Sequence, residues 1–327
     1  MYQVISVANV LNPFEEIYGK VDVSNELRGQ NSEILVTGEF ASAIRKGTIL
    51  PLSVNEVSNQ ICPTGRDVYI SKGLNRPKSR KIRNGSPSFE RTAGMIGEKF
   101  FVEFLMDQIK TKTSYKELKD ESDRYFVTFL KSKKKKLDEL KNESSRDYNI
   151  FLSQLKSSGR IEATVSNFLS EFTDKKITKD NIKFHTSLNP NSLTGISKDS
   201  KPDFLVPNLK LVGDIKSGEA LRDSDLLICT GYAIAYENAI KTNIDWGMIY
   251  FFKAKNQVKY GRYVSLPQVY IFPIDDSLRN WFIQRRNQAL DIAKKGNCPP
   301  FPSKENTKKC HHCRFKSFCE GEGLVIE

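Results

Sequence analysis

The strongest constraint on the fold is a short segment, residues 201–218, with the sequence KPDFLVPNLKLVGDIKSG. It contains two apolar runs separated by a Pro-Asn pair. Residues 202–206 and 209–216 each predict a β-strand, and Pro207-Asn208 predicts the tight turn that joins them. We therefore expect a β-hairpin with buried strands at this point of the chain.

Two acids and a lysine occupy positions that this hairpin brings together. Side chains alternate along a strand, so Asp214 and Lys216 share one face of the second strand, and Asp203 comes from the first. Two carboxylates held close repel each other unless a cation lies between them. Mg²⁺ or Mn²⁺ suits such oxygen ligands, and the main-chain carbonyl of Ile215 is a further candidate ligand. Lys216 is placed to orient a water or offset phosphate charge, so the set predicts metal-assisted phosphodiester hydrolysis. The other interpretation is that these are ordinary turn, strand-end and solvated residues.

A helix predicted over residues 89–110 carries a third acid. Gly94, Glu98, Phe101, Val102 and Leu105 fall on one stripe at helical spacing. A carboxylate on a buried stripe needs a partner, and a metal shared with the hairpin acids provides one. Alternatively, Glu98 marks the edge of the stripe and reaches water. Further helices are expected over residues 225–240 and 278–295.

The chain is basic, with 51 Lys and Arg against 39 Asp and Glu and a net charge of +12. This balance favours a polyanionic partner, nucleic acid first and an anionic membrane second. No run of about 18 apolar residues occurs, so we expect no transmembrane helix. The first residues lack the basic start and apolar core of a signal peptide. The 6 cysteines are too few in a long chain to suggest a disulfide framework, and we expect a protein of the reducing cytoplasm.

Three of these cysteines form a C-x2-C-x5-C run in a basic, aromatic tail: Cys310, Cys313 and Cys319. Thiolates so close in sequence can converge on one metal centre. The fourth ligand is not local, and the candidates are Cys62, Cys298, His311 and His312. The pattern itself leaves open a metal–sulfur cluster, a structural zinc site and a set of reduced cysteines that bind nothing.

In the order of its motifs the chain resembles the CRISPR-associated branch of the RecB-like exonucleases, which have a PD-(D/E)xK core and an iron–sulfur cluster. That branch has one cysteine ahead of the core in a Cys-Pro-x-x-Arg-Asp-x-Tyr-like context, which matches Cys62 in CPTGRDVY, and three behind it. The resemblance spans residues 52–110 and 182–320. It implies a cluster, usually 4Fe–4S, held by Cys62, Cys310, Cys313 and Cys319.

The resemblance also implies roles for residues of the core. It gives metal binding to Asp203 and Asp214, positioning of the attacking water or the phosphate to Lys216, and support of the DNA or the lysine to Tyr232. Cys229, on the same predicted helix as Tyr232, is expected to be a small buried residue.

Two positions depart from the family pattern. The histidine that follows a glycine by four residues in many members is Glu98 here, and we expect its carboxylate to bind the metal in place of the imidazole. The glutamine that precedes the active-site tyrosine by four falls on Ile228, whose side chain makes no hydrogen bond. A second register, with Tyr236 as that tyrosine and Tyr232 in the glutamine position, therefore stays open.

We expect an α/β fold with a restriction-endonuclease-like core, in which helices flank a mixed central sheet. The predicted segments are an N-terminal segment (1–51), the Cys62 segment with the first nuclease helix (52–110), a charged helical insertion (111–180), the nuclease core (181–275), and a C-terminal helix with the iron–sulfur module (276–327). The lysine run at 131–136 either contacts a phosphate backbone or is a solvated helix face.

The expected activity is Mg²⁺- or Mn²⁺-dependent exonuclease cleavage of single-stranded DNA ends. The resemblance implies the processing of spacer precursors in CRISPR adaptation, with CRISPR integrase proteins as partners. The alternatives are a zinc-stabilised, non-catalytic nucleic-acid-binding protein and a general DNA-repair nuclease.

Overall fold

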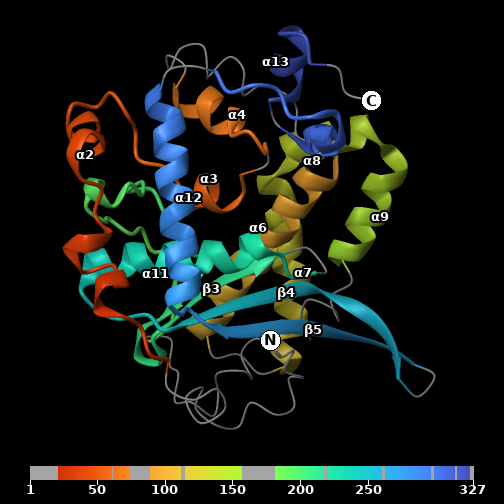
Figure 1. The fold of residues 1–327 in the computed structure, drawn as a ribbon. Coiled ribbons are helices and arrows are strands. Elements are labelled where there is room, and N and C mark those ends of the chain that lie inside the picture. Colours follow the sequence, from red (N-terminus) through yellow and green to blue (C-terminus); the bar gives the residue numbers. More distant parts are fainter. Residues whose placement is uncertain are drawn as a thin grey trace.

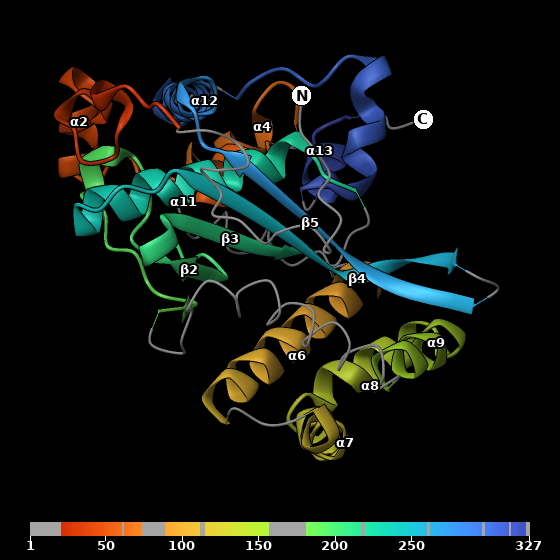
Figure 2. The same ribbon diagram turned by 90° about the horizontal axis from the view of Figure 1, so that it is seen from below.

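A computed structural model describes residues 21–60, 62–73, 89–111, 115–156, 181–216, 220–259, 262–295, 298–313 and 315–324. A mixed sheet lies at the centre, with helices on both faces (Figure 1). Seen from below, α11 and α12 cover one face of the sheet, and α6 lies against the other with α7, α8 and α9 beyond it (Figure 2). This arrangement agrees with the α/β class predicted from the sequence.

The described part of the sheet has five strands in the order β1-β2-β3-β4-β5. They are β1 (Lys183–Phe184), β2 (Phe204–Val206), β3 (Leu211–Lys216), β4 (Trp246–Lys259) and β5 (Arg262–Pro273). β3 and β4 run parallel, and every other neighbouring pair is antiparallel. Because parallel neighbours need a crossover connection, α11 (Asp223–Ile240) links β3 to β4 across one face of the sheet.

The predicted hairpin is present as β2 and β3, but its strands are shorter than expected. β2 begins at Phe204 rather than at residue 202, because Pro202 has no N–H to give to the ladder and the Asp203 carboxylate accepts the Ile215 N–H instead. The turn is a 3-10 turn, Pro207–Leu209, followed by Lys210 in the left-handed region at φ 51°. The second strand therefore starts at Leu211 and not at residue 209.

The remaining elements are helical. The longer helices are α2 (Gly38–Arg45), α6 (Phe89–Thr111), α7 (Tyr115–Ser132), α8 (Lys134–Glu143), α9 (Ser145–Lys156) and α12 (Asp276–Lys295). The short ones are η2 (Asn25–Leu27), η3 (Ser32–Ile34), α3 (Val54–Ser58), α4 (Arg66–Val68), the π-helical turn η4 (Tyr69–Gly73), η5 (Ser192–Thr194), η7 (Lys304–His312) and α13 (Lys316–Gly321). The described helices include none that is long and apolar enough to cross a membrane. α7, α8 and α9 lie within the predicted insertion, whose residues 112–114 and 157–180 fall outside the described part.

Alternation along β2 and β3 divides the core into two clusters. Leu205 and Val212 belong to the cluster under α11 and α12, whereas Phe204 and Ile215 pack with Phe101 of α6 on the other face. Val212 and Ile215 therefore lie on opposite faces of the second strand, as its alternation predicts. Asp214 follows Val212 by two residues, so it shares the face that α11 covers.

α11 is buried on nearly all sides, because the sheet lies below it and α12 and α3 lie above. Gly231 allows this close approach: a Cβ atom there would lie 2.5 Å from the Phe282 ring and 2.7 Å from a methyl group of Val54. Since real Cβ atoms do not come so close to other heavy atoms, a larger residue would push the helices apart. The position of α11 over the sheet is therefore set by packing.

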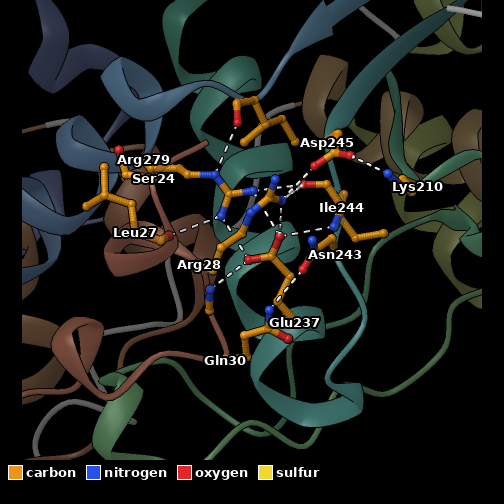
Figure 3. A network of polar contacts seen from close by, with 12 residues as sticks. Ser24, Leu27, Arg28, Gln30, Lys210, Glu237, Asn243, Ile244, Asp245 and Arg279 are labelled. Carbon is orange, nitrogen blue, oxygen red and sulfur yellow. Dashed lines mark hydrogen bonds and ion pairs between the residues drawn. The ribbon is translucent and has the colours of Figure 1, made fainter. Parts of the chain in front are cut away.

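The far end of α11 is held by a buried charge network (Figure 3). Glu237 of α11 and Arg279 of α12 have fully buried side chains. The Arg279 guanidinium donates two hydrogen bonds, of 2.8 and 3.0 Å, to the Glu237 carboxylate. Arg28 lies 2.9 Å from Glu237 and 2.6 Å from Asp245, and the Ile244 N–H donates to Glu237 at 3.0 Å. One carboxylate thus joins the N-terminal segment, α11, α12 and the start of β4.

We expect Glu237→Gln to lower the free energy of unfolding by roughly 3–5 kcal/mol, because it removes the charge that compensates two buried guanidinium groups. Denaturant unfolding followed by circular dichroism would measure this. Glu139→Gln on the exposed side of α8 is the control and should change the free energy by less than about 0.5 kcal/mol. Equal unfolding midpoints for the two variants would contradict this account of the network.

Candidate functional site

The hairpin brings the two predicted acids together at the edge of the β2–β3 pair. Extending the register of Phe204 opposite Gly213 by one residue places Asp203 opposite Asp214. Asp203 is 9% exposed and Asp214 is 5% exposed. Asp203 Oδ2 accepts the Ile215 N–H at 2.6 Å, and Asp214 Oδ2 pairs with Lys216 Nζ. The main chain of β3 thus holds the carboxylate of Asp203, which directly precedes β2.

Glu98 extends from α6 toward this pair. Burial raises the pKa of Glu98 to about 7; the charge of Asp214 adds to the rise and Lys216 opposes it. Glu103, one turn further along, instead pairs with Lys99 at 3.4 Å on the half-exposed side of the helix. The structure therefore turns Glu98 toward the hairpin and not toward the polar face of α6.

Burial raises the pKa of Asp203 well above its ordinary value, and the charges of Asp214 and Glu98 raise it further. Burial by itself would lower the pKa of Lys216, but the Asp214 carboxylate outweighs it, so the pKa is raised and the ammonium keeps its proton. The charge of Asp214 thus disfavours the ionised forms of both Asp203 and Glu98. If all three carboxyl groups were ionised, three negative charges would face the single positive charge of Lys216.

The two tyrosines of α11 differ in their position relative to the acids. Burial raises the pKa of Tyr232, and the charges of Asp214, Asp203 and Glu98 contribute to the rise. Burial alone raises the pKa of Tyr236. α11 therefore turns Tyr232 toward the carboxylates, whereas no such charge acts on Tyr236. Cys229 is fully buried, as predicted.

The structure adds two residues to those that the sequence indicated. His185 Nδ1 lies 3.8 Å from Asp203 Oδ1, and His185 has a left-handed backbone at φ 45°. Asp225, in the first turn of α11, accepts the Arg222 N–H at 3.0 Å, and the charge of Lys216 lowers its pKa against the larger effect of burial. In the sequence Asp225 looks like a helix cap, and His185 reaches the site only through the pairing of β1 with β2.

The donor set fits a hard divalent cation, since carboxylate oxygens are the ligands that Mg²⁺ and Mn²⁺ prefer. A cation would also supply the positive charge that the three carboxyl groups lack. Among the described residues, however, no group of three or more His, Cys, Asp or Glu side chains is arranged to hold a metal ion. The Asp214 carboxylate forms an ion pair with Lys216 Nζ.

A second candidate site lies between the turn before α4 and the C-terminal tail. Cys62, Cys310, Cys313 and Cys319 all line one cavity, together with Arg66 and other residues. Burial raises the pKa of the Cys313 thiol to about 11, and the Phe315 N–H, 3.4 Å from Sγ, opposes this rise. Four thiols around one cavity fit a soft metal centre, either zinc or an iron–sulfur cluster.

Of the other candidate fourth ligands, Cys298 is exposed and is not among the described residues that line this cavity. The side chains of His311 and His312 lie outside the described part. Among the described residues that line this cavity, Cys62 accompanies the three tail cysteines, and Cys298 is not one of them.

From the raised pKa of Glu98 we predict how the stability of the metal-free protein depends on pH. A carboxyl group whose pKa is raised on folding destabilises the folded state at pH values above its unfolded pKa. Stability should therefore fall as the pH rises from about 4.5 to about 7. In EDTA at pH 8, Glu98→Gln should unfold at higher denaturant than wild type, by up to about 3 kcal/mol.

At pH 5 this advantage of Glu98→Gln should shrink. Glu103→Gln, on the polar side of the same helix, is the matched control and should follow the wild-type profile. A Glu98→Gln protein that is less stable than wild type at pH 8 in EDTA would show that Glu98 does not face the other acids.

Comparison with known proteins identifies the family. The family model described as CRISPR-associated exonuclease Csa1 matches residues 1–323. A curated relative of the same description, from Saccharolobus solfataricus, is 27% identical over 310 residues, which cover 91% of this chain and 92% of the relative. No solved structure gives a significant match. The resemblance inferred from the motif order is confirmed, and the chain belongs to the CRISPR-associated exonuclease Csa1 family.

Proposed function

We propose that this chain is a metal-dependent exonuclease that acts on single-stranded DNA ends and trims spacer precursors in CRISPR adaptation. The observation that carries the proposal is the convergence of Asp203, Asp214, Glu98 and Lys216 around the β2–β3 hairpin. The family supports a nuclease of a CRISPR system. In this proposal α6, the hairpin and α11 form a PD-(D/E)xK core, and CRISPR integrase proteins are the partners that the role implies.

Asp203, Asp214 and Glu98 would hold Mg²⁺ or Mn²⁺, with the Ile215 carbonyl as a further ligand. The bound ion would stabilise phosphate charge and acidify a water. Because Asp214 keeps Lys216 protonated, the lysine acts as a cation beside the phosphate and not as a base. Tyr232, whose raised pKa likewise keeps its proton, offers a hydroxyl donor from the opposite wall of the site.

A cluster, 4Fe–4S by family resemblance, would be held by Cys62, Cys310, Cys313 and Cys319. All four positions would be filled by cysteine, so its role would be structural. It would join the turn before α4 to the C-terminal tail. Zinc in the same cavity would satisfy the same thiols, which makes metal analysis the deciding measurement.

The nuclease activity is tested with end-labelled single-stranded DNA and Mn²⁺. Asp214→Asn and Lys216→Met should each lower the cleavage rate by about 100- to 1000-fold, because each removes charge stabilisation of the transition state. Tyr232→Phe should lower it by about tenfold. Tyr236→Phe, one turn along α11, is the matched control and should cleave at the wild-type rate. If all variants degrade DNA equally, the cutting belongs to a contaminant.

The metal centre is tested on protein purified without oxygen. Wild type should be brown and contain iron and acid-labile sulfide, and Cys62→Ser should lose both, because it removes one of four thiolate ligands. Cys298→Ser should keep both, since Cys298 is exposed and outside the cavity lining. Colourless protein that contains zinc would instead support the non-catalytic nucleic-acid-binding alternative.

A further inference from the structure

One buried arginine ties the turn that contains Cys62 to the C-terminal tail. Arg66 opens α4 and is 5% exposed. Its Nη1 donates to the Pro299 carbonyl oxygen at 2.6 Å, and its Nη2 pairs with Glu322 Oε2 at 2.6 Å. The guanidinium also lies over the Phe301 ring, 4.2 Å from its centre. All three of these partners follow α12, so they belong to the tail that carries the other cysteines.

The same guanidinium faces the cysteines. Arg66 lines the cavity that Cys62, Cys310, Cys313 and Cys319 share. The buried guanidinium therefore places a positive charge beside thiols that would carry negative charge when they bind a metal.

The buried Nε atom of Arg66 has no hydrogen-bond acceptor among the described residues. Leaving a buried donor unsatisfied costs about 1–3 kcal/mol, and more where the group is charged. Thiolate and sulfide sulfurs accept hydrogen bonds. A sulfur-bound metal centre in the cavity would therefore bring the kind of acceptor that this N–H lacks.

We propose that Arg66 is a positioning residue for the metal centre held by the four cysteines, and that its Nε–H donates to a sulfur of that centre. The inference rests on the proposed cysteine-held centre. Four thiolates outweigh the charge of the metal that they bind, so a buried cation beside them lowers the cost of burying the site. Hydrogen bonds to the sulfurs also shift the reduction potential of a cluster.

Lysine cannot take over this set of contacts. A guanidinium presents its donors in one rigid plane, and here Nη1 bonds Pro299, Nη2 bonds Glu322, and the buried Nε is left for a further acceptor. An ammonium at position 66 keeps the charge and can reach Glu322, but it cannot also reach a main-chain carbonyl and a sulfur. Arg66→Lys therefore separates the effect of charge from that of the directed Nε–H.

The test uses the full-length chain, purified without oxygen. Bound metal, acid-labile sulfide, the rate of metal loss to EDTA and the midpoint reduction potential are measured for wild type and Arg66→Lys. Arg66→Lys should lose its metal about 10- to 100-fold faster, the usual effect of removing a group that supports metal ligands. Its visible absorption bands and potential should shift as well, which a purely structural role would not cause.

Glu322→Gln is the matched control, because it removes the ion pair but leaves Nε and the bond to Pro299 in place. It should lose metal within about threefold of the wild-type rate, since the Glu322 side chain is half-exposed and water can replace its contact. If both variants lose metal equally fast, Arg66 only ties down the tail and the proposal is wrong. If Arg66→Lys does not fold, Arg66→Gln takes its place and should lose metal faster still.

The same measurements distinguish a failure of the role of Arg66 from a failure of the cysteine-held metal centre. Wild-type protein that contains neither iron nor zinc overturns the cysteine-held centre and the role of Arg66 together. Wild-type protein that is loaded, and that releases metal at the same rate and shows the same potential as Arg66→Lys, overturns the role of Arg66 alone.

Discussion

The buried carboxylate of Glu237 is the interaction on which the arrangement of the elements depends. It accepts from Arg28, Arg279 and the N–H groups of Gly29 and Ile244, so four separate parts of the chain meet at one charge. A buried charge is tolerated only when its oxygens are fully satisfied. The network therefore fixes the C-terminal end of α11 over the sheet. Figure 3 shows this convergence.

Fixing α11 matters for the site because that helix contributes one wall of it. α11 leaves β3 just after Lys216 and returns the chain to β4, so its first turns pass over the carboxylate face of the hairpin. The crossover places Tyr232 near Asp214 although 18 positions separate them in sequence. α6 supplies Glu98 from a different direction. The site thus depends on three elements, of which α11 is held in place by the packing at Gly231 and by the Glu237 network.

Local periodicity was enough to predict which side chains of the hairpin and of α6 share a face. Alternation along one strand placed Asp214 and Lys216 together, and the helical stripe on residues 89–110 turned Glu98 toward the core. The start of β2 could not be read in the same way, because it depends on the Asp203 side chain taking the Ile215 N–H. His185 was missed for a related reason, because its contact with Asp203 comes from the pairing of β1 with β2. Arg66 belongs to the CPTGRDVY motif, but the motif does not indicate its contacts with Pro299 and Glu322 of the tail.

The position of Arg66 has a consequence for how the protein is made. Its partner Glu322 is 256 positions further along the chain, and three of the cavity cysteines lie in the same late stretch. During translation, the turn around Cys62 leaves the ribosome early and stays without its counterpart for most of synthesis. The cavity closes only when the final residues have emerged. A chain that stops before them lacks three of the four cavity cysteines, so cofactor loading would distinguish finished molecules from truncated ones.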